Sequence, residues 1–233
     1  MYYSSLKKNI CIIPARQGSK RLLGKNIKNF FGKPIIYYPI KEALKSKLFD
    51  RVIVSTDSKI IAKISKEFGA DIHFREQKYC SDLIGIDVVI KKVIQYLSAK
   101  YNFNKVCCIF PTSVFFTKKN LNEAFKKLKK KNQYIFSAYK ISEPIERVFF
   151  KSKGRVKMLM DKYYKKKNKV FYKHYYHDAA QFYLGWKKSW VLKKKIFSNY
   201  SNFIEFQKDQ VQDIDDIHDW KIAKKKWKNL KFY

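Results

Sequence analysis

The chain has 233 residues and a formal net charge of +33 at pH 7, with 52 Lys and Arg against 19 Asp and Glu. This length is enough to bury one full core, so residues 1–233 are expected to form a single domain. Only six of the basic residues are arginine, and the lysines are spread along the chain, so nucleic-acid binding stays an alternative that the composition does not favour.

Four cysteines occur without C-x-x-C spacing and without clustered histidines, which argues against a zinc site and against a disulfide framework. The beginning of the chain contains one short apolar run before charged residues return. That run is too short for a signal-peptide core or a membrane span. We therefore expect a soluble, cytoplasmic protein without a membrane partner.

Apolar, strand-like runs alternate with helical periodicity from residue 10 to residue 139. Each connection is long enough to hold a helix, which favours a mostly parallel sheet with helices on both faces, a Rossmann-like α/β fold. Strands are predicted at Ile10–Pro14, Arg51–Ser55, Asp71–Phe74, Lys105–Phe110 and Tyr134–Tyr139. Helices are predicted at 34–46, Lys59–Phe68 with Asp57 or Ser58 as the cap, Ile86–Leu97 and Asn120–Lys130.

The alternation stops after Tyr139. Residues 141–180 mix β-rich pieces with a lysine cluster, and their aromatic side chains are too many for a loop lying on its own sheet. We expect this segment to be an excursion that forms a subunit interface, and the chain to be a homodimer. Its aromatic residues are Phe149, Phe150, Tyr163, Tyr164, Phe171 and Tyr172. Beyond it, a strand is predicted at Gln181–Leu184, a short helix at Lys187–Lys194 and a closing helix at Asp213–Leu230.

The stretch IIPARQGSKRLLGKN, residues 12–26, follows the first predicted strand. A triphosphate needs exposed backbone N–H groups and fixed cations, and ligands of open α/β sheets gather beyond the carboxyl ends of the strands. The stretch matches neither the Walker nor the Rossmann fingerprint, and a solvated basic loop is the alternative. Its small residues and cations are Gly18, Ser19, Gly24, Arg16, Lys20, Arg21 and Lys25.

An acidic cluster occurs near the end of the chain, in VQDIDDIHDW. Asp213 and Asp215 are two residues apart, so in an extended segment they point to the same side and can hold one hard cation together with water and phosphate oxygens. The alternative is that the cluster caps the closing helix. Because the whole chain has only 19 acidic residues, this density favours a metal site.

The stretch at 12–26 resembles the N-terminal signature of the cytidylyltransferases that activate sialic-acid-like sugars, the acylneuraminate cytidylyltransferase family. The resemblance implies a fold of the nucleotide-diphospho-sugar transferase type, with residues 141–180 as an arm that packs on a partner subunit. It also implies a Mg²⁺-dependent reaction of CTP with a nine-carbon 2-keto sugar acid, giving a CMP-sugar and pyrophosphate. By this resemblance, the residues that hold CTP are Ala15, Arg16, Gly18, Ser19, Lys20, Lys25, Asn26 and Ser113.

The same resemblance assigns roles in the reaction. Lys25 and Arg16 would neutralise the leaving pyrophosphate, and Asp213 and Asp215 would bind Mg²⁺. No general base is identified, and Asp215 acting through a metal-bound water is one option. Among the cations of the loop, Lys25 is expected to have the largest single effect, whereas Arg21 has no firm counterpart in the signature and can equally be a surface residue.

The run HDAAQFY, residues 177–183, lies where sialic acid enzymes of the family carry R-x-N-G-x-(I/V)-Y. It is similar to the form found in pseudaminic acid cytidylyltransferases, which implies pseudaminic acid as the sugar. The alternative sugars are neuraminic, legionaminic and eight-carbon keto acids. The alternative without a sugar-binding role is that the run is a core strand rich in Tyr and Phe with a capping Asp. The expected sugar-binding residues are Arg75, Asp178, Gln181 and Tyr183.

Overall fold

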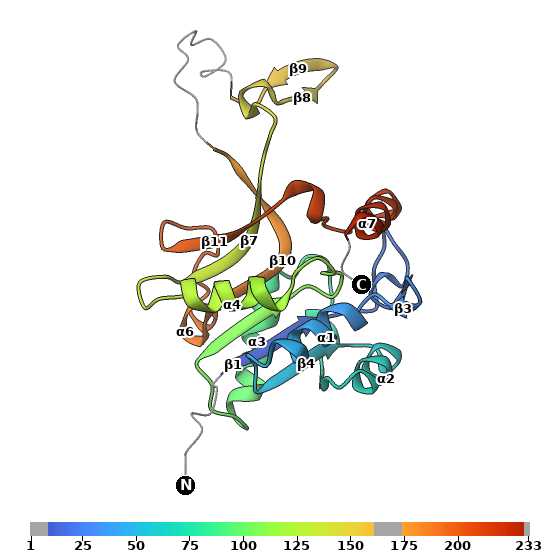
Figure 1. Ribbon diagram of the computed structural model, residues 1–233, viewed down its shortest axis with the longest axis vertical. Coiled ribbons are helices and arrows are strands. Elements are labelled where there is room, and N and C mark those ends of the chain that lie inside the picture. Colours follow the sequence, from blue (N-terminus) through green and yellow to red (C-terminus); the bar gives the residue numbers. More distant parts are fainter. Residues whose placement is uncertain (1–8, 161–173, 231–233) are drawn as a thin grey trace.

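The computed structural model describes residues 9–160 and 174–230, and its centre is a seven-stranded mixed sheet (Figure 1). The strand order is β11-β7-β10-β6-β1-β4-β5, and β10 runs antiparallel to both of its neighbours. The other neighbouring pairs are parallel, so the expected mostly parallel sheet is confirmed. The strands are β1 (Asn9–Pro14), β4 (Arg51–Thr56), β5 (Asp71–Phe74), β6 (Lys105–Ile109), β7 (Tyr134–Lys140), β10 (Tyr176–Trp186) and β11 (Ser201–Phe206).

Helices cover both faces of the sheet because its central strands are apolar on both sides. Alternate residues of β1 show this: Cys11 packs toward α1, α2 and α4, whereas Ile12 packs toward α3 and α6 on the opposite face. The helices are α1 (Tyr37–Ser46), α2 (Lys59–Glu67), α3 (Ile86–Ser98), α4 (Lys118–Lys127), α6 (Lys187–Val191) and α7 (Ile217–Asn229). Short 3₁₀ helices are η1 (Lys25–Ile27), η2 (Gln77–Tyr79), η3 (Ile145–Arg147) and η4 (Lys208–Gln210).

Three predicted helix starts differ from the structure: α4 begins at Lys118, two residues before its predicted start, and the two larger differences each have a local cause. The helix expected from residue 34 begins at Tyr37, because Lys33–Pro34 (β3) pairs with Asn29–Phe30 (β2) in a small hairpin. The closing helix begins at Ile217, four residues later than expected. Asp216 is its N-cap and accepts hydrogen bonds from the backbone N–H groups of His218 and Asp219, which ends the extended chain there.

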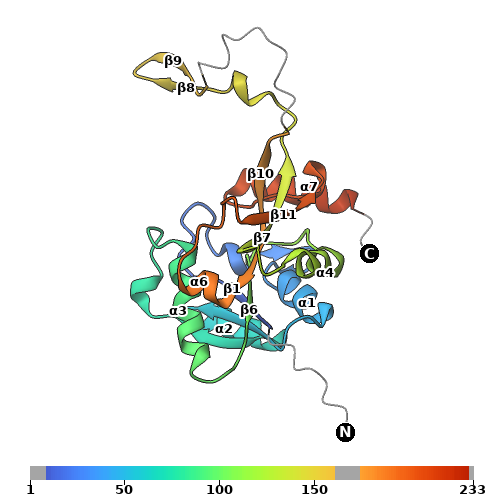
Figure 2. The same ribbon diagram turned by 90° about the vertical axis from the view of Figure 1, so that its left-hand side faces the viewer.

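The expected excursion lies between β7 and β10, which continue past the sheet as a two-stranded ribbon (Figures 1 and 2). The return strand begins at Tyr176, five residues before its predicted start. Far from the sheet, the ribbon carries a hairpin of β8 (Phe149–Ser152) and β9 (Arg155–Met158). Phe149 and Phe150 are both exposed on this hairpin. The other four aromatics predicted for the interface, Tyr163, Tyr164, Phe171 and Tyr172, lie outside the described residues.

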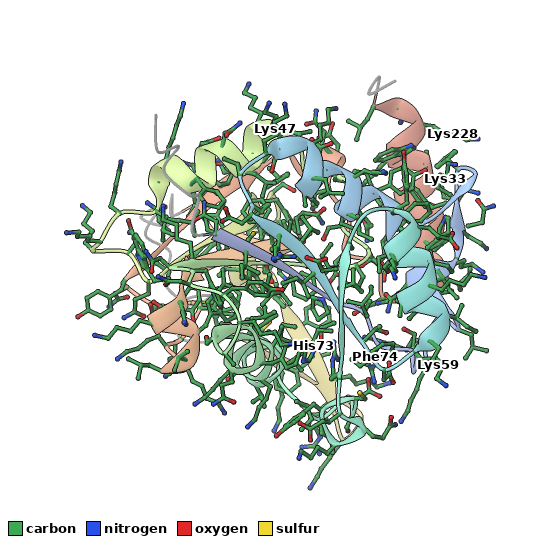
Figure 3. The ribbon with its side chains drawn as sticks, turned by 90° about the horizontal axis from the view of Figure 1, so that it is seen from below. Lys33, Lys47, Lys59, His73, Phe74 and Lys228 are labelled. Carbon is green, nitrogen blue, oxygen red and sulfur yellow. The ribbon has the colours of Figure 1, made fainter. Side chains whose placement is uncertain are left out.

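The lysines project from many elements of the fold. Figure 3 shows Lys33, Lys47, Lys59 and Lys228 pointing outward from β3, the end of α1, α2 and α7. The four cysteines are free and buried. In the described part of the chain, no helix combines the length and the apolar character that a membrane crossing requires.

Candidate active site

A cavity of about 390 Å³ lies beyond the carboxyl ends of β1 and β6. At this edge of the sheet, the loops that follow the parallel strands lie close together. The loop after β1, the segment before α7, the loop between β5 and α3, and an irregular part of β10 all contribute to its walls. Side chains that bear on its chemistry are Arg16, Ser19, Arg21, Lys25, Asn26, Arg75, Asp82, Asp178, Tyr183, Asp213 and Asp215.

Lys25 connects the loop after β1 to the acidic segment near the end of the chain. Gly24 precedes it with φ +62°, a left-handed conformation that favours glycine, and this residue caps η1. The Lys25 ammonium donates to the backbone carbonyl of Ile214 at 2.7 Å and to Asp215 Oδ1 at 3.2 Å. The Lys25 side chain is 18% exposed, and these two bonds fix its position in the cavity wall.

The segment 213–215 is extended, and its alternating side chains divide between the core and the cavity. Ile214 is fully buried among the aromatic residues Phe30, Trp220 and Trp227, so Asp213 and Asp215 on either side of it face the cavity. The helix-capping interpretation of the acidic cluster holds for Asp216, which caps α7, while the carboxylates of Asp213 and Asp215 line the cavity.

The two carboxylates differ in their surroundings. Asp215 forms two ion pairs: its Oδ2 lies 2.9 Å from the Arg21 guanidinium, and its Oδ1 contacts the Lys25 ammonium. Asp213 is accessible from the cavity, and no hydrogen bond or ion pair to its carboxylate occurs within residues 9–160 and 174–230. Protein atoms around the cavity displace water from the Asp213 carboxylate. This desolvation, and after it the negative charge of Asp215, raises the pKa of Asp213 to about 6.

A divalent cation fits this donor set. The described residues contain no group of three or more His, Cys, Asp and Glu side chains placed to hold a metal, so this part of the chain offers the pair Asp213 and Asp215 and no larger cluster. Mg²⁺ is commonly bound in this way, through one or two carboxylates with water and substrate phosphates completing its shell. The repulsion between Asp213 and Asp215 that raises the pKa of Asp213 is what a bound cation would relieve.

Arg16 is oriented by the loop between β5 and α3. Its guanidinium donates through NH1 to the carbonyl of Cys80 at 3.1 Å and through NH2 to Asp82, whose pKa this contact lowers. Lys20, largely exposed, lies 3.6 Å from the same carboxylate. Asn26 is buried behind Arg16 and donates to its carbonyl oxygen at 2.8 Å, but Asn26 Oδ1 has no hydrogen-bond partner among the described residues. A buried acceptor in the cavity wall without a partner is suited to a ligand donor.

Arg75 is a buried cation without a carboxylate partner in the described part of the chain. It is 9% exposed, and it donates to Ser55 Oγ at 3.3 Å and to the Ser55 carbonyl at 2.9 Å. Burial lowers the pKa of its guanidinium, although an arginine stays charged at neutral pH. A buried charge of this kind is stabilised by an anionic or strongly polar ligand.

The HDAAQFY run forms a bulge in β10, between the pairs Asp178–Ala138 and Tyr183–Phe136. The Asp178 carboxylate holds this bulge from the cavity side. It accepts the N–H of Ala180, which has φ +48°, and the phenol hydroxyl of Tyr183. Burial raises the pKa of Asp178. Asp178 and Tyr183 both line the cavity as one hydrogen-bonded pair.

Gln181 lies on the core side of the same bulge. It is fully buried, its amide donates to the Ala179 carbonyl at 2.9 Å, and its side-chain oxygen accepts the N–H of Phe115 at 3.3 Å. Ser113 is also buried and donates to the carbonyl of Gln181 at 2.8 Å. These two side chains shape the bulge from behind, and neither lines the cavity described here.

Most of the residues predicted from the sequence meet at this cavity, but some do not. Ala15 is buried with its N–H bonded to the Ser55 carbonyl at 2.9 Å, and Gly18 and Lys20 lie outside the lining. Arg21, for which the sequence offers a surface position as an equal alternative, lines the cavity and contacts Asp215. Arg21 and Lys25 contact the two oxygens of the Asp215 carboxylate, and because residues 21–24 are not helical, their spacing in the sequence does not predict this shared contact.

Comparison with known proteins shows what this chain is similar to. The family model described as Cytidylyltransferase matches residues 10–231. A pseudaminic acid cytidylyltransferase of Campylobacter jejuni serotype O:2 is 36% identical over 221 residues, which is 93% of this chain and 95% of the relative. An N-acylneuraminate cytidylyltransferase of Escherichia coli O18:K1:H7 is 31% identical over 93% of this chain and 51% of its own length.

Solved structures agree in fold. A CMP:2-keto-3-deoxy-manno-octonic acid synthetase complexed with CTP superposes with a TM-score of 0.70 at 12% identity, covering 95% of this chain and 99% of that one. A 4-diphosphocytidyl-2C-methyl-D-erythritol synthase of Anaerococcus prevotii superposes with a TM-score of 0.64 at 14% identity, covering 94% and 98%.

Proposed function

The chain belongs to the cytidylyltransferase family, and we propose on that basis that it joins CTP to a nine-carbon 2-keto sugar acid, releasing a CMP-sugar and pyrophosphate. Pseudaminic acid is the proposed sugar. The observation that carries the proposal is that a cationic loop and two carboxylates, far apart in the sequence, meet in one cavity through the contact of Lys25 with Asp215.

The triphosphate side of the cavity is proposed to be the loop after β1. Arg16, Arg21 and Lys25 supply positive charge there. Gly18, Ser19 and Lys20 belong to the same loop, and the free oxygen of Asn26 is a ready acceptor for a nucleotide hydroxyl or amino group. Fixed cations lower the free energy of a leaving pyrophosphate because they neutralise charge as the bond breaks.

The proposed metal ligands are Asp213 and Asp215. Mg²⁺ held there would neutralise phosphate charge and acidify a bound hydroxyl group. The side chains of the protein have their own tasks in this arrangement: Lys25 and Arg21 fix the Asp215 carboxylate from two sides, and Ile214 anchors the segment in the core.

The sugar side is proposed to be the wall formed by Arg75, Asp178 and Tyr183. A guanidinium presents a planar fork that matches a carboxylate, and the Asp178–Tyr183 pair offers an acceptor next to an aromatic ring. Gln181 is proposed to act on specificity through the shape of the bulge.

The reaction needs one bond to form and one to break. The C2 hydroxyl oxygen of the sugar acid bonds to the α-phosphorus of CTP, the bond from that phosphorus to the bridging oxygen of the β-phosphate breaks, and pyrophosphate leaves. The hydroxyl proton goes to a base that the sequence does not identify, and Asp215 acting through a water is one option. Holding both reactants in one cavity supplies much of the rate, because it removes the entropy cost of bringing them together.

Pyrophosphate release from CTP, measured across a panel of keto sugar acids, tests the proposal. We expect pseudaminic acid to exceed N-acetylneuraminic acid in kcat/KM by at least about tenfold, because a site built for one set of polar groups rejects another. A preference for neuraminic, legionaminic or an eight-carbon acid would change the substrate and keep the reaction. No release with any acid, together with salt-sensitive binding to random-sequence DNA, would instead support the nucleic-acid alternative.

The arm at 141–180 is proposed to hold two subunits together. The β8–β9 hairpin exposes Phe149 and Phe150 away from the sheet, and exposed apolar groups of this kind mark interfaces. Light scattering at micromolar concentration should give a dimer for the native chain and a monomer for the double variant Phe149→Asp/Phe150→Asp.

A matched control for the arm lies on the edge strand β5. Phe74 is 61% exposed and Phe149 is 62% exposed, so Phe74→Asp makes the same chemical change at a similar exposure. This variant should remain dimeric. A monomer mass for the native chain, or dissociation by Phe74→Asp alone, would contradict the assignment of the interface to the arm.

A further inference from the structure

Asp82 forms ion pairs with two cations that are assigned to CTP binding in the proposed function. It lies between η2 and α3 and contacts Arg16 and Lys20, both from the loop after β1. Arg16 is bound to this segment twice, since its other terminal nitrogen donates to the carbonyl of Cys80. The loop after β1 and the loop between β5 and α3 are therefore held together at the cavity, and we call these contacts of Asp82 and Cys80 with Arg16 and Lys20 the clip.

Resting on the proposed function, we infer that Asp82 is an internal competitor of the polyphosphate: it holds Arg16 and Lys20 when the site is empty and takes them back when pyrophosphate leaves. A phosphate group binds arginine through the same guanidinium fork that a carboxylate uses. One N–H of an Arg16 terminal nitrogen donates to Asp82, so a phosphate oxygen that takes the same N–H displaces the carboxylate.

The other paired carboxylate of the cavity, Asp215, is in a different position. Asp215 is a proposed metal ligand, so its charge is compensated when metal and nucleotide are bound together. Asp82 is not one of the proposed metal ligands, so its charge stays beside the triphosphate unless it moves away. Repulsion between these like charges separates them when CTP binds.

The strength of the clip suits a reversible competitor. The Asp82 side chain is 44% exposed and that of Lys20 is 84% exposed, and ion pairs that reach solvent are weak. A ligand with several phosphate charges can therefore displace the carboxylate. The apparent affinity of that ligand equals its affinity for the open form multiplied by the fraction of molecules in which the clip is open.

Titration calorimetry of the full chain tests the inference, with CTP, pyrophosphate and CMP as ligands at constant Mg²⁺. The variant Asp82→Asn should bind CTP and pyrophosphate roughly threefold to tenfold more tightly, because the negative charge that attracts Arg16 and Lys20 is removed and the clip opens more easily. CMP has neither the β- nor the γ-phosphate, so its affinity should change less than about twofold. Raising the salt concentration should shrink the difference, since exposed charges are screened.

Asp57→Asn is the matched control. Asp57 lies beside the same loop and accepts the N–H of Gln17 at 2.8 Å, and an asparagine there removes one negative charge while keeping an acceptor. Its affinities should stay within about twofold of the native values. Equal tightening by Asp57→Asn would assign the effect to general electrostatics and overturn the inference.

The remaining outcomes separate this inference from the proposed function. Native-like or weaker CTP binding by Asp82→Asn, with tight binding by the native chain, overturns the inference alone and makes Asp82 inert or an orienting group for Arg16. If the native chain binds none of the three ligands, the proposed function fails, and the inference fails with it.

Discussion

Asp215→Asn and Asp213→Asn are each expected to lower the Mg²⁺-dependent turnover number by at least about a hundredfold, with CTP affinity weakened less. The physical reason is the small number of donors: the protein offers two carboxylates, so the loss of either leaves a single anionic ligand for a hard cation. At Asp215 the change also removes the charge that Arg21 and Lys25 neutralise. Pyrophosphate release at saturating CTP across a range of Mg²⁺ concentrations measures the effect.

Asp216→Asn provides the control within the same cluster. Its side chain caps α7, and asparagine caps helices about as well as aspartate, so stability and turnover should both stay near the native values.

Protonation offers a second check on Asp213, whose pKa is about 6. As the pH falls through 6, this carboxylate gains a proton and loses its charge, so Mg²⁺ affinity should decrease. Full activity of either Asp213→Asn or Asp215→Asn would return the motif to helix capping.

Lys25→Ala is expected to lower turnover by about a hundredfold to a thousandfold, the range found when one group that stabilises a developing anion is removed. The structure adds a second cause to this loss. Lys25 also bonds to Ile214 and Asp215, so its removal loosens the segment that carries the proposed metal ligands. We therefore expect Mg²⁺ affinity to weaken together with turnover, which the kinetics as a function of Mg²⁺ will show.

Lys33→Ala tests whether charge alone explains this effect. Lys33 lies on β3 and points outward, so its replacement removes the same charge without touching the cavity. Its activity should stay within about twofold of native. A loss of less than about tenfold in Lys25→Ala, with the fold intact by circular dichroism, would show that the loop after β1 does not have the assigned role.

The core of the fold could be predicted because its signals are local. Buried strands such as Arg51–Thr56 are continuous apolar runs, and helices such as Ile86–Ser98 repeat apolar residues at helical spacing. The strand β11 was missed because its six residues, SNFIEF, form a short run at the edge of the sheet that is neither continuous nor strictly alternating. The antiparallel direction of β10 was also missed, since it depends on how the arm returns to the sheet.

The sequence by itself determined which chemistry is present: a basic loop with Gly24 after a buried strand, and two carboxylates two residues apart, which an extended segment turns toward one side. Only the tertiary structure decided which of these groups meet. Two of these contacts join residues that are distant in the chain: Lys25 with Asp215, and Arg16 with Asp82. The inward turn of Gln181 depends on the shift of strand register at the bulge. Side-chain spacing specifies local geometry, whereas these contacts arise from how the strands pair and the helices pack, and no local pattern encodes that.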